Sequence, residues 1–150
     1  MDDLDAIDRR IIDALVANGR ITVTDLAAKA GLSKTPCQNR MRRLEERGYI
    51  RGYTAITDPA KLGAGHIAFV QVTLSDTRSA ALAAFNEAVR SVREIEECHM
   101  IAGGFDYLLK VRTRDIAGYR RVLGERISAL PHVTQTSTFV VMEAVKDRSR

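Results

Sequence analysis

Cysteine is scarce in this chain of 150 residues, and the two that occur, Cys37 and Cys98, lie far apart. Neither stands in a Cys-x-x-Cys motif or a Cys/His cluster, so the sequence contains no disulfide framework and no ligand set for a metal. No apolar run approaches the roughly 20 residues of a membrane-spanning helix. The acidic start, Met-Asp-Asp-Leu-Asp, is unlike a signal peptide. We therefore expect a soluble, cytoplasmic protein without metal, cofactor or membrane partner.

Positive charge is concentrated in one segment. The formal net charge is +4 and the isoelectric point about 9.3. Between Lys34 and Arg51 basic residues far outnumber acidic ones. The net charge of this segment alone equals the net charge of the whole chain. Such clustering is typical of a surface that contacts nucleic-acid phosphates.

Two short helices are expected before this basic segment. Leu4, Ile7, Ile11 and Leu15 recur at helical spacing over residues 4–17, with Asp5 as N-cap and Asn18-Gly19 as the end. A second helix begins at Thr22, has Asp25 at the capping-box offset, and ends at Gly31.

A third helix carries the basic residues. Ser33 is its expected N-cap, Pro36 lies in its first turn, and Gly48 ends it. Two helices joined by a tight turn at Gly31 predict a helix-turn-helix, with residues 33–47 as the recognition helix. Residues 49–57 then predict a short strand pair or wing.

The recognition helix presents residue types that read DNA. Its expected buried stripe is Cys37, Met41 and Leu44, which leaves polar side chains outside. Gln and Asn bond adenine edges, whereas Arg reads guanine or holds phosphate. The predicted DNA-binding residues are Ser33, Lys34, Thr35, Pro36, Gln38, Asn39, Arg42, Arg43 and Arg47. The alternative is a solvated amphipathic helix with a basic face.

The pattern changes after a predicted linker over residues 58–65. Strands are expected over 66–74, 95–102, 107–113 and 133–145. One helix is expected between the first and second strands and another between the third and fourth. This βαββαβ order predicts a ferredoxin-like sandwich, and hence an α+β protein. The predicted domains are a winged helix-turn-helix over 1–57, the linker over 58–65, a ligand-sensing and oligomerisation domain over 66–145, and a tail over 146–150.

One face of the predicted sheet lacks a cover. The first strand has Ala68 and Val70 on one side and Ile67 and Phe69 on the other, whereas two helices cover a single face. An uncovered apolar face needs a partner. We therefore expect this domain to dimerise through its sheet.

The motifs together resemble the Lrp/AsnC family of transcription regulators, most closely the branch of leucine-responsive regulators and activators of proline catabolism. The resemblance covers nearly the whole chain. It rests on Leu4-Asp-Ala-Ile-Asp8, Leu32-Ser-Lys-Thr-Pro-Cys37, Arg40-Met-Arg-Arg-Leu-Glu45, Gly48-Tyr-Ile50, Gly52-Tyr-Thr-Ala55, Glu97-Cys-His99, Gly104-Phe-Asp-Tyr-Leu-Leu-Lys110, Tyr119-Arg, Leu130-Pro and Val140-Val-Met-Glu143. It implies a winged helix-turn-helix joined to a βαββαβ ligand-sensing domain, with homodimers that assemble further, often to octamers. It also implies an amino-acid effector, with leucine and proline as candidates, bound between dimers.

A candidate effector site lies around residues 102–107. Gly103 and Gly104 allow close approach of a ligand, Asp106 could pair with an ammonium group, and Thr136 and Thr138 share a strand face. The resemblance adds Met100, Ile116, Val140 and Val141. The alternative is that the segment is an ordinary strand-to-strand turn, where Asp is common.

Other functions are less well supported. An architectural protein that wraps DNA with little sequence preference is the main alternative. The sequence shows no nucleophile–base pair, paired acids or phosphate loop, so we do not expect an enzyme. Cys98 and His99 are adjacent in a strand and point to opposite faces, which favours packing over metal binding. Cys37 is expected in the core and not in a redox switch.

Overall fold

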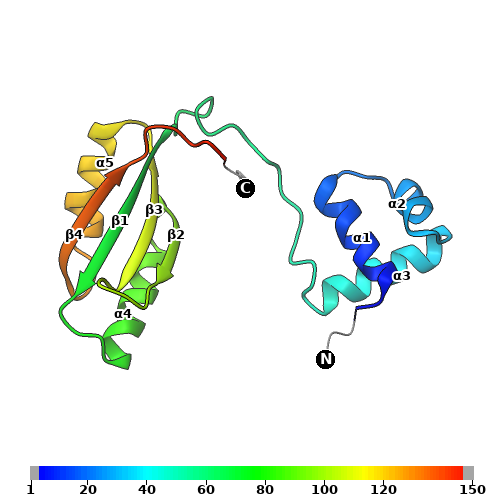
Figure 1. The fold of residues 1–150 in the computed structure, drawn as a ribbon, viewed down its shortest axis with the longest axis horizontal. Helices are drawn as coiled ribbons and strands as arrows, with labels where there is room; N and C mark the ends of the chain where they lie inside the picture. The colour runs from blue at the N-terminus through cyan, green and yellow to red at the C-terminus, as the bar shows by residue number, and fades with distance from the viewer. Residues whose placement is uncertain (1–3, 147–150) are drawn as a thin grey trace. The chain divides into compact units, whose positions relative to one another are not determined.

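The computed structural model describes residues 4–146, and the chain divides into two compact units (Figure 1). The first ends at Ile56 and the second begins at Thr57. Most of the predicted tail, residues 147–150, lies outside the described part. None of the helices within residues 4–146 combines the length and hydrophobicity of a membrane-spanning segment.

The first unit consists of α1 (Ala6–Ala17), α2 (Val23–Ala30) and α3 (Lys34–Glu46). The predicted starts of α1 at Asp5 and of α2 at Thr22 are confirmed. Asp5 Oδ1 accepts from the backbone N–H groups of Ile7 and Asp8 at 2.9 and 2.8 Å. The Thr22 hydroxyl accepts from Asp25 N–H at 3.1 Å and donates to the Asp25 carboxylate at 2.7 Å. Gly31 takes a left-handed φ of 72° and turns the chain into α3.

One expectation for this unit is confirmed in position only, and another is wrong. Ser33 stands at the N-cap of α3, but its side chain makes no cap hydrogen bond. No strand forms over residues 49–57, so the predicted strand pair is absent. The segment is tied back to α3 instead, because Ile50 N–H donates to the Leu44 carbonyl and the Tyr53 hydroxyl donates to Glu45.

The three helices enclose a small apolar core. Ile11, Leu26, Cys37 and Leu44 are almost completely buried in it. The prediction that Cys37 is a core residue is confirmed, and burial raises the pKa of its thiol. A raised pKa keeps the sulfur protonated and unreactive.

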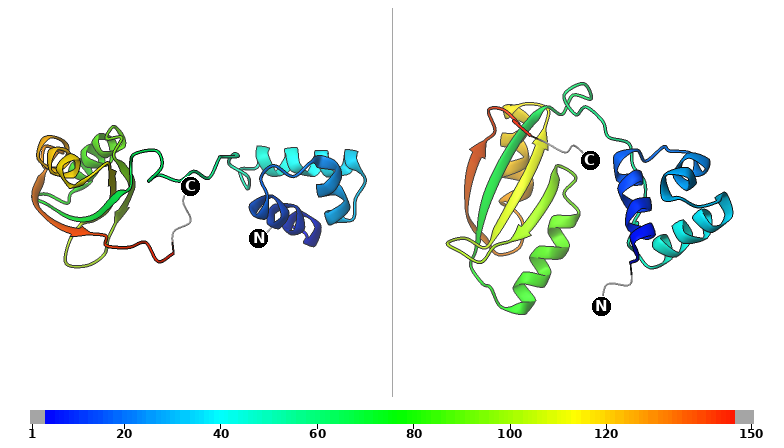
Figure 2. Two further views of the ribbon diagram at one scale, coloured as in Figure 1. Left: turned by 90° about the horizontal axis from the view of Figure 1, so that it is seen from above. Right: turned by 45° about the vertical axis from the view of Figure 1, so that its right-hand side comes forward.

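The second unit is a four-stranded antiparallel sheet with helices on one face (Figure 2). Its elements are β1 (His66–Leu74), α4 (Ser79–Arg90), β2 (Ile95–Met100), β3 (Tyr107–Thr113), α5 (Ile116–Val122), the π-helical turn η1 (Leu123–Ile127) and β4 (Val133–Val140). The strand order is β2-β3-β1-β4. This is the predicted βαββαβ arrangement, and the predicted bounds of β1 and β3 are confirmed.

Two strands end earlier than expected. β2 stops at Met100 because Ile101 N–H donates to the Asp106 carbonyl and closes a turn. β4 stops at Val140, after which Val141 N–H makes a last bond to the Ile67 carbonyl. The chain then leaves β1, so residues 141–145 do not extend the strand as predicted.

The alternation predicted for β1 is confirmed. Ala68, Val70 and Val72 are fully buried on the side of the helices. Their neighbours in this core include Phe85 of α4 and Tyr107 of β3, whose ring centroids lie 4.3 Å apart. Ile67 and Phe69 point to the opposite, open face, which the helices do not cover, although Ile67 itself is buried there.

Candidate DNA-binding and effector-binding sites

The outer face of α3 carries most of the predicted DNA-binding residues. Those exposed to solvent are Ser33, Lys34, Thr35, Pro36, Gln38, Asn39, Arg42 and Arg47. Arg42 Nη2 donates to Asn39 Oδ1 at 3.4 Å, so these two side chains lie together on the outer face. An exposed carboxamide beside a guanidinium is suited to contact a base edge and a phosphate at the same time.

Arg43 does not lie with this exposed set, which corrects the prediction that it points outward. Its Nη2 lies 2.6 Å from Asp8 Oδ2 on α1. Arg40 Nη1 lies 2.8 Å from Asp8 Oδ1 and 2.6 Å from Asp5 Oδ2. The side chain of Asp8 is 1% exposed, so its charge is buried and neutralised by two guanidinium groups of α3.

This ion-pair cluster of Asp5, Asp8, Arg40 and Arg43 fixes α3 against α1. Hydrogen bonds from Asp8 N–H and from Arg40 lower the pKa of the Asp5 carboxyl. Hydrogen bonds to Asp5 and then Asp8 raise the pKa of Arg40. Sequence reasoning missed the cluster. The available signal was Asp8 itself, which stands four residues after Leu4 and three before Ile11, on the apolar stripe of α1.

Four predicted effector residues lie at one end of the sheet. Met100, Gly103, Gly104 and Asp106 belong to the end of β2 and the turn that follows. Asp106 N–H donates to the Val72 carbonyl at 3.0 Å, and its Oδ2 accepts from Leu74 N–H at 2.7 Å. Asp106 therefore holds the turn against β1 and leaves Oδ1 for another donor.

The other predicted effector residues lie elsewhere. Val140 pairs with Ala68 near the start of β1, whereas Tyr107, next to Asp106, pairs with Val72 four residues further along. Four residues of strand span about 13 Å. Val141 follows Val140, and Ile116 begins α5 directly after β3 ends. Since β2 and β4 form opposite edges of the sheet, Met100 and Val140 do not meet within one chain.

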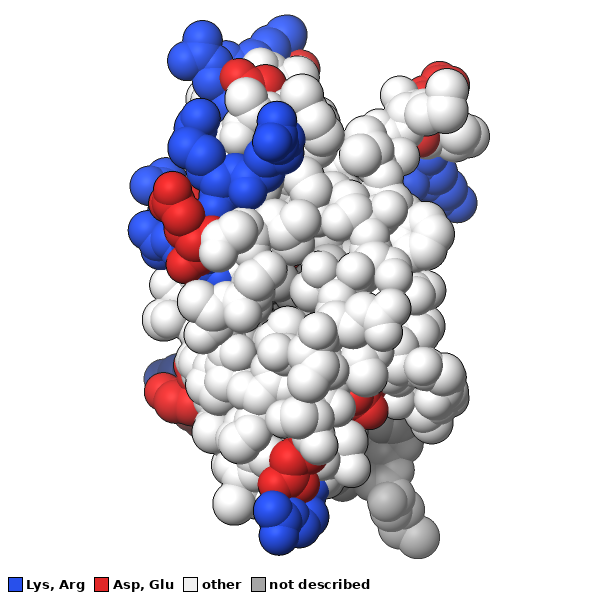
Figure 3. Space-filling view, turned by 90° about the vertical axis from the view of Figure 1, so that its left-hand side faces the viewer, with Lys and Arg blue, Asp and Glu red and all other residues white. Residues whose placement is uncertain are grey.

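Thr136 and Thr138 share the helix-facing side of β4, as predicted from their spacing. They pair with Val72 and Val70, whose side chains lie in the core. The Thr138 hydroxyl forms a short hydrogen bond with the Tyr119 hydroxyl of α5. Figure 3 shows the face with β4 and α5, whose middle is uncharged while Lys and Arg gather near one end.

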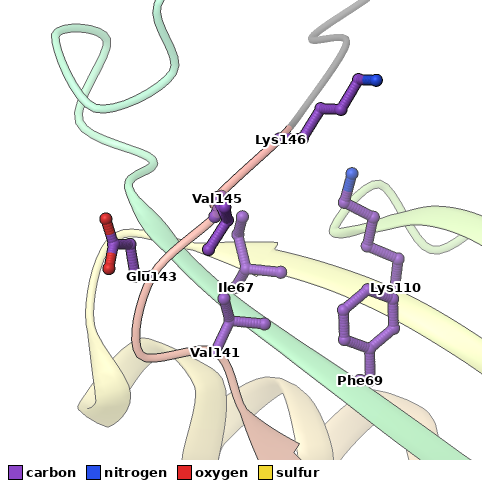
Figure 4. Close-up of a pocket in the computed structure, with 8 residues that line it drawn as sticks. Ile67, Phe69, Lys110, Val141, Glu143, Val145 and Lys146 are labelled. Atoms are coloured by element: carbon purple, nitrogen blue, oxygen red, sulfur yellow. The ribbon is translucent and has the colours of Figure 1, made fainter.

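The open face of the sheet is apolar at its centre. Phe69 pairs with Phe139 on one side and with Lys110 on the other. Phe139 is 53% exposed. Residues 141–146 cross this face beside Ile67, Phe69 and Lys110 and form with them a hollow of about 330 Å³ (Figure 4).

Comparison with known proteins assigns each of the two units to a protein family. Residues 67–150 match the Lrp/AsnC ligand binding domain. The chain belongs to the Lrp/AsnC family. Residues 4–51 of this Lrp/AsnC chain match the winged helix-turn-helix DNA-binding family.

Relatives that match this Lrp/AsnC chain over nearly its whole length are named as regulators. The proline dehydrogenase transcriptional activator of Rhizobium radiobacter is 62% identical over 146 residues, which cover 97% of this chain and 94% of the relative. The leucine-responsive regulatory protein of Escherichia coli (strain K12) is 48% identical over 148 residues, which cover 99% and 90%. The chain is therefore a DNA-binding transcription regulator and not an enzyme.

Solved structures agree with this assignment of the Lrp/AsnC chain. An AsnC family transcriptional regulator from Agrobacterium tumefaciens superposes with a TM-score of 0.91 at 33% identity, over 98% of this chain and 95% of that one. A transcriptional regulator from Neisseria meningitidis, in complex with L-Met, gives a TM-score of 0.89 at 28% identity, over 98% and 96%. The predicted family and fold are confirmed.

Proposed function

We propose that this regulator binds specific double-stranded DNA sites through α3, controls genes of amino-acid metabolism in the cytoplasm, and responds to a free amino acid. The observation that carries this proposal is the outer face of α3, where Gln38, Asn39 and Arg42 are exposed on a helix that Asp8 fixes to α1. The name of the Rhizobium relative supports proline metabolism as the regulated process. The name of the Escherichia coli relative supports leucine as a candidate effector, and the complex of the Neisseria regulator adds methionine.

The residues of α3 divide into two roles. Gln38 and Asn39 stand near its N-terminal end, the part of a recognition helix that reaches base edges. Arg42 and Arg47 lie further along and are placed to hold phosphates, which positions the protein without reading sequence. Arg43 is engaged by Asp8, so its first role is to hold α3 in place.

Substitution of Gln38 or Asn39 by Ala tests this division. We expect each variant to lose about 10- to 100-fold in preference for its selected site over random DNA, because a bidentate base contact is lost. Nonspecific affinity should stay unchanged. The measurement is competition binding on a site selected from a random DNA pool. As a control, Arg47→Ala should weaken binding to both DNAs by a similar factor and reduce the salt dependence. Unchanged preference in both variants would favour the architectural, DNA-wrapping alternative.

The regulator is proposed to act as a homodimer joined through the open sheet face. Phe69 and Phe139 lie side by side there, and Phe139 remains half exposed. A second copy would bury this surface and hold two α3 helices at a fixed separation. Such a pair reads palindromic half-sites about one helical turn, or a multiple of it, apart.

The effector is proposed to bind where two dimers meet, as they assemble to octamers or similar oligomers. The group formed by Met100, Gly103, Gly104 and Asp106 and the group formed by Ile116, Val140 and Val141 lie at opposite ends of one sheet. A ligand that contacts both groups therefore needs two chains. Thr136 and Thr138 lie on β4, the strand that carries Val140. A ligand at this seam shifts assembly if it binds the two states with different affinity.

Mixed oligomers test the shared site. Met100→Ala and Val140→Ala remove exposed side chains, so each variant should fold but bind the effector more weakly. When the two are unfolded and refolded together at equal amounts, roughly one site in four should recover both side chains, because subunits pair at random. The measurement is calorimetric titration with L-leucine, L-proline and L-methionine, with light scattering to follow mass. No recovery in the mixture would contradict a site shared between chains.

A further inference from the structure

A second hollow of about 280 Å³, which is polar, lies in the second unit beside α5. It is formed by the end of β3, by α5 with η1, and by the residue that precedes β2. Its charged and polar lining consists of Glu94, Thr113, Arg114, Arg121, Glu125 and Arg126. None of the predicted DNA-binding or effector residues lines it, so it is separate from both sites above.

The three arginines of this hollow have no partner among residues 4–146. Other arginines of the second unit form ion pairs, for example Arg78 with Asp76 and Arg90 with Glu87. Within residues 4–146, Arg114, Arg121 and Arg126 make no hydrogen bond or ion pair with the protein. Three guanidinium groups around one hollow present a set of donors suited to carboxylates or phosphates.

Glu94 adds an unsatisfied acceptor to the same hollow. Its Oε2 is shielded from solvent and has no hydrogen-bond partner in the described part of the chain. The residue is fixed by its backbone, because the Glu94 carbonyl accepts from Arg112 N–H at 2.8 Å. A shielded acceptor without a partner is costly, and a bound donor would remove that cost.

These two observations select a ligand with groups of both signs. A purely anionic ligand, such as inorganic phosphate or a DNA backbone, would be attracted by the arginines but repelled by Glu94 and Glu125. An α-amino acid with an acidic side chain carries two carboxylates for the guanidinium groups and an ammonium group for Glu94. The volume of the hollow is near the lower limit for ligand pockets, which suits a molecule of this size.

We propose that this hollow binds an acidic α-amino acid, with Arg114, Arg121 and Arg126 holding its carboxylates and Glu94 accepting from its ammonium group. The site would let the regulator sense a second metabolite independently of the seam between dimers. It contains no residue of that seam, so either site can fail without the other.

Calorimetric titration of the full-length protein tests the site, with L-glutamate, L-aspartate, glutarate and phosphate as probes. Glutarate has the two carboxylates of glutamate but lacks the ammonium group, so it should bind at least about tenfold more weakly, as expected for one lost charge-assisted hydrogen bond. Arg121→Gln should weaken glutamate binding by a similar factor. Arg120→Gln, an exposed neighbour outside the lining, should leave it unchanged.

A substitution of Glu94 isolates the ammonium contact. Glu94→Gln should remove most of the preference for glutamate over glutarate, whereas the exposed control Glu87→Gln should retain it. Circular dichroism should show all four variants folded. The proposal is overturned if neither glutamate nor aspartate binds at millimolar concentration, or if glutarate binds as tightly as glutamate. It is also overturned if Arg121→Gln lowers DNA affinity and leaves glutamate binding intact, which would make the hollow part of a DNA-wrapping surface.

Discussion

Replacement of Asp8 by Asn should destabilise the first unit by about 2–3 kcal/mol. Asp8 is almost fully buried and receives Arg40 and Arg43 on separate carboxylate oxygens. A neutral amide has a single acceptor oxygen, so at least one guanidinium group would lose its partner and face an N–H₂ group. Removing one partner of a fully buried pair costs about 3–5 kcal/mol. The cost is smaller here because solvent still reaches both arginines, whose side chains are 26% and 43% exposed.

Urea unfolding monitored by hydrogen exchange at the amides of α1 and α3 measures this loss of stability in the first unit alone. Asp13→Asn is the matched control, since Asp13 is an exposed residue of the same helix. It should change stability by less than about 0.5 kcal/mol. The Asp8 variant should also bind its DNA site more weakly, because α3 is no longer held at one angle. Equal stability of the two variants would contradict the role assigned to Asp8.

The parts of this fold that could be predicted are those that local chemistry determines. Asp5 and Thr22 cap helices because each side chain reaches an N–H two or three residues along the chain. The bounds of β1 could be predicted because its pattern of apolar residues ends on both sides, at residues 66 and 74. Local patterns failed where a segment had no partner to pair with, as over residues 49–57.

Features that join distant residues were not predictable in the same way. The outward or inward direction of Arg43 depends on Asp8, 35 residues earlier in the chain. Helical spacing placed Arg43 outside the buried stripe of Cys37, Met41 and Leu44, but the ion pair with Asp8 directs its side chain toward α1. The effector residues are a further case. The predicted residues lie at two ends of one sheet, so spacing along the sequence does not bring them together within one chain.

Replacement of Phe139 by Asp should abolish the proposed dimer without unfolding the chain. Phe139 is 53% exposed on the open face, beside Phe69, so a carboxylate at this position remains hydrated in a monomer. In a sheet-to-sheet dimer the same carboxylate would be buried against apolar side chains. Burying an unpaired charge costs at least several kcal/mol, which corresponds to a dissociation constant raised by about 100-fold or more.

Sedimentation equilibrium over a concentration series measures the loss of dimer, and circular dichroism verifies the fold. Leu62→Asp is the control, because Leu62 is 70% exposed but lies before β1 and not on the open face. It should leave the dimer intact. Affinity of the Phe139 variant for a palindromic site should fall steeply, because two α3 helices that are no longer linked bind their half-sites independently. A Phe139→Asp protein that remains a dimer would show that the open face is not the dimer interface.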